Sequence, residues 1–138
     1  MAFLYFALML SGSNLLKFSS FGLIAGLLNV LGWLGGLEWL YWIAAILFTG
    51  IWISRNTEER FFINGLLIGL MWSIWNAALE IGFYDALLAN NPAYSESLSE
   101  ISKYLNPKLY LLLLSPVIGI ITGLMIFLAA SLFRKSKK

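Results

Sequence analysis

The side chain in this sequence best placed to do chemistry is the carboxylate of Glu80. It falls within a long apolar run, where an ionisable group is costly and by default raises a functional hypothesis. Asn76 lies four residues earlier, so the two share one face of a helix. Glu38 and Asp85 are further carboxylates expected near the same level. Together these residues form a candidate ion or polar site: Glu80, Asn76, Glu38 and Asp85.

Two interpretations of Glu80 are open. A helix rises about 1.5 Å per residue, which puts Glu80 about 28 Å from Phe61 and in the outer part of a bilayer rather than at its centre. There the carboxylate is either hydrated or paired with Lys108, as at an ordinary interface. Alternatively, the acidic residues form a cation or proton site. The feature that separates the two interpretations is whether Glu80 faces a wet cavity.

The chain contains no Cys and no His. Without Cys there is no disulfide, thiol redox chemistry or iron–sulfur ligation, and without His the commonest general base and the usual haem or zinc ligand are missing. The sequence therefore argues against a Ser-His-Asp hydrolase and a His-ligated metal or haem site. A carboxylate-only metal site and a Ser-Lys dyad stay open, but no motif indicates either. We expect no catalytic residue, no cofactor and no metal.

Composition indicates that lipid is the solvent for much of this chain. Of its 138 residues, 60% are hydrophobic and 12% are charged, against roughly 45–50% apolar and about 25% charged in soluble domains. So little polar surface cannot cover a soluble core. We expect a single membrane domain over residues 1–138, with an all-α polytopic fold and no nucleic-acid partner.

Four apolar runs approach the length of about 20 residues that crosses the hydrocarbon of a bilayer. They cover about residues 18–34, 37–53, 61–87 and 108–133. The sequence therefore predicts a four-helix transmembrane bundle. The third run is longer than needed and is expected to tilt or to emerge from the bilayer, and Pro116 is expected to kink the fourth.

Two shorter helices are predicted outside the spans. Residues 1–16 are apolar but too short for a span, so we expect an interfacial or partly inserted helix, with a signal peptide or a short fifth span as alternatives. In the polar loop 88–107, Asn91-Pro92 is typical of a helix start. This loop helix is expected to be amphipathic and able to lie on the membrane. Its apolar residues recur every three or four positions: Tyr94, Leu98, Ile101 and Leu105.

The positive charges predict the orientation of the bundle. Of the nine Lys and Arg residues, seven fall on one side of the predicted spans and two, Lys103 and Lys108, fall on the other. Because Lys and Arg concentrate in cytoplasmic loops, the C-terminus and the loop 54–60 are predicted to be cytoplasmic and the loop 88–107 outside. The seven are Lys17, Arg55, Arg60, Arg134, Lys135, Lys137 and Lys138.

Pairs of glycines at spacing four occur in three of the predicted spans. In lipid, where apolar burial does not drive helices together, such pairs let two backbones approach closely and gain dispersion contact. Asn29 and Asn76 lie on the same faces and are expected to donate hydrogen bonds between helices. The predicted helix-packing positions are Gly22, Gly26, Asn29, Gly65, Gly69, Gly119 and Gly123.

Several local motifs occur together along residues 15–138. They are Leu16-Lys17-Phe18 leading to Phe21-Gly22-Leu23-Ile24-Ala25-Gly26, the charged hairpin before Phe62-Ile63-Asn64-Gly65, Asn91-Pro92-Ala93-Tyr94, and Pro116 with Gly119 and Gly123 before the basic tail. This order resembles an uncharacterised family of small four-span bacterial inner-membrane proteins, classed as a domain of unknown function. The resemblance implies a multi-pass protein of the cell (inner) membrane and no particular activity.

Two functions follow as hypotheses. The first is a non-enzymatic accessory protein, scaffold or small subunit that packs against other membrane proteins or against copies of itself in the lipid bilayer. It agrees with the absent catalytic chemistry and the glycine-rich faces. The alternative is a small cation- or proton-coupled transporter or channel that uses Glu80. Such a protein is expected to be oligomeric, because four spans with few polar groups make a poor pathway alone.

Overall fold

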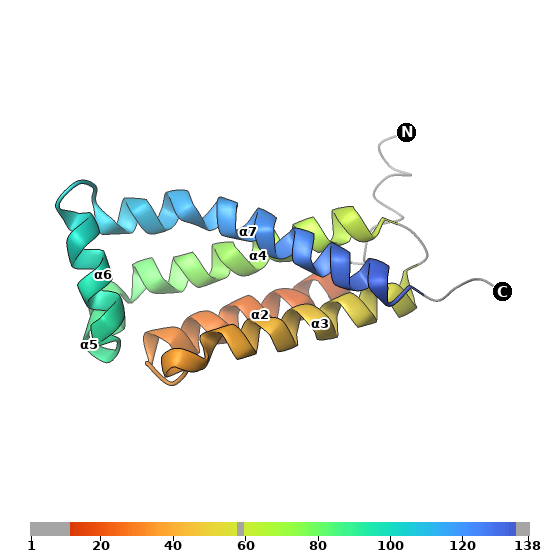
Figure 1. Ribbon diagram of the computed structural model, residues 1–138, viewed down its shortest axis with the longest axis horizontal. Coiled ribbons are helices and arrows are strands. Elements are labelled where there is room, and N and C mark those ends of the chain that lie inside the picture. Colours follow the sequence, from red (N-terminus) through yellow and green to blue (C-terminus); the bar gives the residue numbers. More distant parts are fainter. Residues whose placement is uncertain (1–11, 58–59, 135–138) are drawn as a thin grey trace.

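The computed structural model describes residues 12–57 and 60–134, and the regular structure there is entirely helical (Figure 1). The prediction of an all-helical fold is therefore confirmed. Three segments are long and apolar enough to cross a membrane, namely Gly35–Asn56, Phe61–Gly82 and Pro107–Leu132. The elements are α2 (Gly12–Val30), the 3-10 helix η1 (Gly35–Leu37), α3 (Glu38–Asn56), α4 (Phe61–Gly82), α5 (Tyr84–Asn90), α6 (Pro92–Ser102) and α7 (Pro107–Leu132).

The first apolar helix differs from the predicted span 18–34. Its apolar part, Asn14–Val30, is shorter than the three membrane-length segments. The helix stops because Gly32 adopts a left-handed backbone with φ of 69°. The N–H groups of Gly32 and of the next residue donate to carbonyls of the last helical turn at 2.9 and 3.0 Å, which is a Schellman-type ending. The predicted span continues to residue 34, beyond the end of α2 at Val30, because Gly32 lies inside an apolar run.

The predicted third span, 61–87, is two helices rather than one. Helix α4 ends at Gly82, Phe83 leaves helical geometry with φ of -113° and ψ of 37°, and α5 begins at Tyr84. Figure 1 shows α5 and α6 lying across the end of the long helices. The apolar run continues past Phe83 because Leu87 of α5 packs inside the protein, at 0% exposure, and not because the helix continues through the membrane. The prediction of one long helix was therefore wrong.

The helix predicted in the loop 88–107 is present as α6. Its residue Leu98 is 2% exposed, so the apolar face of α6 packs on the protein and caps the end of the bundle. Most of the N-terminal extension 1–16 lies outside the described residues, and positions 12–16 belong to α2. The fourth run agrees closely with α7, which contains Pro116 in its interior.

The long helices pack around a small set of close contacts. Helix α4 makes its largest contact with α7, α2 packs on α4, and α3 packs on α7. Glycines lie at these contacts: a Cβ added at Gly22 would stand 2.5 Å from the Trp72 Cα, and one added at Gly123 would stand 2.7 Å from the Leu66 Cα. Gly26, Gly65, Gly69 and Gly119 face neighbouring helices at similarly short range. The core beside these contacts is apolar and includes Ile53, Ile68, Trp72 and Ile126.

Candidate functional site

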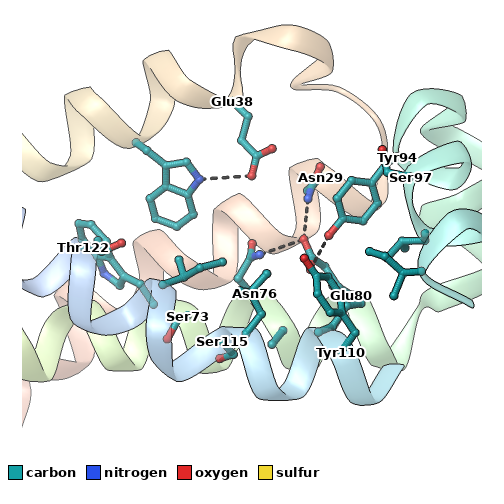
Figure 2. A pocket seen from close by; sticks show the side chains of 18 residues that line it. Asn29, Glu38, Ser73, Asn76, Glu80, Tyr94, Ser97, Tyr110, Ser115 and Thr122 are labelled. Atoms are coloured by element: carbon teal, nitrogen blue, oxygen red, sulfur yellow. Dashed lines mark hydrogen bonds between the residues drawn. The ribbon is translucent and has the colours of Figure 1, made fainter. Parts of the chain in front are cut away.

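Glu80 lies in the last part of α4 and is 5% exposed. Two amides converge on its Oε1 atom: the Asn76 Nδ2 donates at 2.9 Å and the Asn29 Nδ2, from α2, donates at 2.6 Å. The hydroxyl of Tyr94, from α6, donates to the Oε2 atom at 3.5 Å. Figure 2 shows these three side chains pointing at the carboxylate from three different helices. The three hydrogen-bond donors to the Glu80 carboxylate are therefore neutral groups.

The contact between α2 and α4 brings Asn29 to Glu80. A Cβ added at Gly26 would lie 3.2 Å from the Asn76 Cα, so the absence of a side chain at Gly26 lets the two helices approach at this level. Asn29 is three residues further along α2 and therefore on the same face. It is 8% exposed. The glycine spacing thus sets the register in which an amide of α2 meets a carboxylate of α4.

The end of α2 also holds α5 and α6 in place. The Asn90 Nδ2 donates to the Val30 carbonyl at 2.9 Å, and the Asn91 Nδ2 donates to the Asn29 carbonyl at 2.8 Å. Carbonyls in the last turn of a helix lack partners within the helix, and Asn90 satisfies the Val30 carbonyl in this way. The Asn29 carbonyl already accepts from the Gly32 N–H at 2.9 Å, and Asn91 adds a second donor. The two bonds fix the start of α6. Tyr94 follows within its first turn and reaches Glu80.

A cavity of about 380 Å³ adjoins Glu80. Side chains from α2, α3, α4, α6 and α7 line it (Figure 2). Polar groups gather along it: Asn29, Glu38, Ser73, Asn76, Glu80 and Tyr94, with Ser97, Ser115 and Thr122 further along. Its apolar walls include Trp42, Trp72, Tyr110, Leu111, Leu114 and Ile118.

Three of the four predicted site residues meet at this cavity. Glu80, Asn76 and Glu38 line it, and the Glu38 Oε1 accepts a hydrogen bond of 3.3 Å from the Trp42 Nε1. Asp85 does not line it: this residue is exposed on α5. The predicted partner Lys108 instead places its Nζ over the Tyr84 ring, 5.2 Å from the centroid.

The electrostatics of the site are unbalanced. Among the residues that the structure describes, Glu80 forms no ion pair. Burial, and next the charge of Glu80, raises the pKa of the Tyr94 phenol above its ordinary value, so this hydroxyl stays protonated and able to donate. The Asn76 Oδ1 is buried without a hydrogen-bond partner. The site therefore offers negative charge and an amide oxygen without a partner, and no cation within residues 12–57 and 60–134 pairs with it.

The described residues do not assemble a conventional metal centre. No group of three or more His, Cys, Asp or Glu side chains in residues 12–57 and 60–134 could hold a metal ion. Two carboxylates reach the cavity, and one of them already binds an indole N–H. Calcium typically takes six to eight oxygen ligands, so it would need hydroxyl groups or waters here in addition to these two carboxylates.

Part of the site does not follow from the sequence pattern. The pattern places Tyr94 on the apolar face of the loop helix and does not link its phenol to Glu80. It does not link Tyr110 or Trp42 to the site either. Of these, Trp42 carried a usable signal, since it lies four residues after Glu38 and shares its helix face. Tyr94 carried none, because its position depends on the break at Phe83.

Comparisons with known proteins add no relative. No family model, no curated protein and no solved structure matches the chain. The resemblance to a four-span family therefore stays a prediction.

Proposed function

We propose that this protein is a multi-pass membrane protein that binds a cation or a proton at Glu80 as part of a transport cycle, with no catalytic residue. One observation carries the proposal: a buried carboxylate with neutral hydrogen-bond donors and no ion-pair partner among the described residues faces a cavity of about 380 Å³. A charge in that setting is costly unless a mobile cation or proton balances it. Of the two interpretations of Glu80, the cavity supports the cation site.

The proposal includes four crossings of the membrane, with α2 as the fourth crossing helix beside α3, α4 and α7. Helix α2 has 19 residues, which at 1.5 Å per residue gives about 28 Å, close to the thickness of the hydrocarbon. It packs on α4 through Gly22 and Gly26 and runs alongside the longer helices in Figure 1. Its length and its packing support a crossing.

The proposed orientation puts the cavity on the outer side of the membrane. Lys17, Arg55, Arg60 and Arg134 belong to the helix ends opposite α5 and α6, whereas Lys103 and Lys108 adjoin α6 (Figure 1). This distribution supports a cytoplasmic C-terminus and an outer α5–α6 cap. A cation would enter from outside, past α6, and the apolar core around Ile53 and Ile68 would close the path inward. Movement of the bundle, or a second copy, would have to open that path.

Charge movement in liposomes tests this proposal. Purified protein is reconstituted, and currents are recorded on a solid-supported membrane after jumps of pH, Na⁺, K⁺ or organic ammonium ions. We expect a transient current in the wild type that Glu80→Gln abolishes. The matched control is Asp85→Asn, which removes an exposed carboxylate at the same end of the molecule, and it should leave the current unchanged. Currents that survive Glu80→Gln would remove Glu80 from the mechanism.

We propose an accessory role within a membrane assembly as the second candidate. It is favoured by a face of α7 that carries exposed apolar side chains every three or four residues. These side chains are between 40 and 58% exposed: Leu113, Val117, Ile121, Leu124 and Leu128. Lipid or the helix of a partner would cover this face. Purification in mild detergent should recover a partner or a homo-oligomer, and a strictly monomeric particle would count against this role.

A further inference from the structure

The free hydrogen-bond acceptors of the cavity lie together at its outer end. The Glu80 Oε1 already accepts two amide N–H groups, while the Oε2 has the Tyr94 hydroxyl at 3.5 Å, the long limit of a hydrogen bond. The Asn76 Oδ1 is buried without a partner. The Glu80 Oε2 and the Asn76 Oδ1 are therefore the two oxygens of this residue pair whose lone pairs the described residues leave largely unused. An ammonium group, with up to three N–H donors, fits this pair of acceptors.

A bare metal ion fits these acceptors poorly. Calcium takes six to eight oxygen ligands and magnesium demands six, and K⁺ sites replace the hydration shell with rings of carbonyl oxygens. In the part of the chain that the structure describes, no cluster of three acidic, His or Cys side chains could hold a metal. Glu80 and Asn76 alone supply fewer oxygens than such a shell, whereas an organic ammonium ion needs only a few hydrogen-bond acceptors.

The remainder of the cavity suits an apolar body with a ring. The Trp42 and Trp72 rings stand 5.6 Å apart at its wall, and the Trp72 Nε1 donates to the Phe18 carbonyl, which fixes that indole in place. The Trp42 Nε1 donates to Glu38, which orients the second indole. Aromatic faces attract both apolar rings and cations, so they would bind an aryl or alkyl group next to an ammonium.

The dimensions agree with a ligand larger than a single ion. Trp72 precedes Glu80 by eight residues on α4, a separation of about 12 Å along the helix. A volume of about 380 Å³ equals that of about a dozen waters, at about 30 Å³ each. The polar outer end and the aromatic inner end are thus far enough apart to hold the two ends of one small amphiphilic molecule.

We propose that the cation taken by this cavity is an organic ammonium ion whose charged group binds Glu80 and the Asn76 Oδ1 and whose apolar body lies against Trp42 and Trp72. This assignment rests on the proposed function, since it names the class of cation for the same site. It also gives the two carboxylates different tasks. Glu80 binds the charge, and Glu38 holds the Trp42 ring that contacts the body of the ligand.

Calorimetric titration of the protein in lipid nanodiscs tests this assignment, with empty nanodiscs as the blank. The probes are 3-phenylpropylammonium, its neutral isostere 3-phenylpropan-1-ol, and propylammonium, which lacks the ring. We expect one saturable site for 3-phenylpropylammonium, at least tenfold weaker binding of the alcohol, and several-fold weaker binding of propylammonium. Equal affinity for the ammonium and the alcohol would overturn the proposal, because the carboxylate would then play no part.

Variants test which residues bind the charged group of the ligand and which bind its apolar body. Glu80→Gln should weaken 3-phenylpropylammonium at least tenfold. Trp42→Leu should weaken it several-fold and leave propylammonium almost unchanged, and Asp85→Asn is the control that should change neither. Circular dichroism and melting in the same nanodiscs show whether each variant is folded. If Trp42→Leu is unfolded, Trp42→Phe replaces it, because it keeps a ring and loses the bond to Glu38.

The two proposals fail in different ways. If jumps of pH, Na⁺ or K⁺ produce a current that depends on Glu80 while 3-phenylpropylammonium neither binds nor competes, the proposed function stands and the ammonium assignment falls. If no cation produces a response that depends on Glu80, both fall. Saturable binding of 3-phenylpropylammonium that Glu80→Gln abolishes supports both.

Discussion

Helices α4 and α7 meet in two different ways along their length. In the half around Gly65, Gly69 and Gly123, which we call the glycine-packed half, backbone lies against backbone: a Cβ added at Gly65 would stand 2.8 Å from the Gly123 carbonyl oxygen. In the half around Glu80, which we call the cavity half, the facing residues of α7 are larger or polar, and α6 closes the end (Figure 1).

The difference shows how one pair of helices can serve two purposes. Small residues allow close approach, and the dispersion contacts that follow hold the helices together in lipid. Large and polar residues keep the same helices apart in the cavity half. Hydrogen bonds from Asn29, Asn76 and Tyr94 then stabilise the Glu80 side chain between the helices. Close contact in the glycine-packed half therefore holds α4 and α7 together, while the two helices stay far enough apart in the cavity half to leave the cavity between them. Substitutions in the two halves should have different consequences.

The largest effect is expected from Gly69→Val in the glycine-packed half. An added side chain at Gly69 would meet the Gly123 backbone nitrogen and the Gly119 carbonyl oxygen, which cannot move without shifting α7. Overpacking of this kind destabilises by about 3 kcal/mol. The free energy of unfolding in mixed micelles of mild detergent and dodecyl sulfate measures it.

The matched control for this substitution is Gly82→Val at the end of the same helix. No atom lies within 4 Å of a Cβ added there, so the change in stability should stay within about 0.5 kcal/mol. Equal losses at Gly69 and Gly82 would show that helix propensity, rather than contact between backbones, determines the effect.

A smaller effect is expected from Asn29→Ala in the cavity half. This change removes the donor at 2.6 Å from the Glu80 Oε1 and leaves the buried carboxylate with fewer partners. Loss of a hydrogen bond to a charged group costs about 1.5–3 kcal/mol. The same unfolding measurement applies, with Ser20→Ala as the control, because Ser20 is exposed on the same helix.

Thr49 offers the opposite case, on α3 next to Gly50, which packs against Ala129 in the glycine-packed half of α7. Its Oγ1 is buried without a hydrogen-bond partner, at 0% exposure of the residue. Thr49→Val removes that group while nearly keeping the volume, so it should be neutral or stabilising by up to about 1 kcal/mol. If Thr49→Val destabilised as much as Asn29→Ala, polar groups in the two halves would not differ in the way proposed here.

Sequence patterns predict the helices better than they predict the site. Apolar runs indicate α3, α4 and α7, and the four-residue spacing of Asn76 and Glu80 puts them on one face. Two features set by local backbone geometry escape such patterns. The left-handed turn at Gly32 ends α2 early, and the break at Phe83 turns α5 across the bundle, which brings Tyr94 to Glu80 from 14 residues further along the chain.

Register between helices is the other part that the sequence leaves open. Asn29 could meet any residue of several turns of α4, and the choice depends on how Gly22 and Gly26 seat against Trp72 and Asn76. The glycine pairs predict that helices approach closely. They do not say which glycine meets which partner, so the pairing of Asn29 with Glu80 requires the three-dimensional packing.

The smallest effect is expected at Tyr94 and appears only at high pH. Burial, and next the charge of Glu80, raises the pKa of the Tyr94 phenol, so the folded state holds this proton more tightly than the unfolded chain, where the pKa is about 10. A raised pKa in the folded state gives a contribution to stability that is fully present below about pH 10 and is lost as the pH rises above it. Melting temperatures of the wild type and Tyr94→Phe should therefore differ by a constant amount up to about pH 9, and the wild type should lose stability relative to the variant above about pH 10.

A titration of tyrosinate absorbance checks the cause, because the variant should lack one phenol that ionises late. If Tyr94 instead ionised at the ordinary phenol pKa of about 10, α6 would not hold the phenol against Glu80, and the cavity half would be open to water at its outer end.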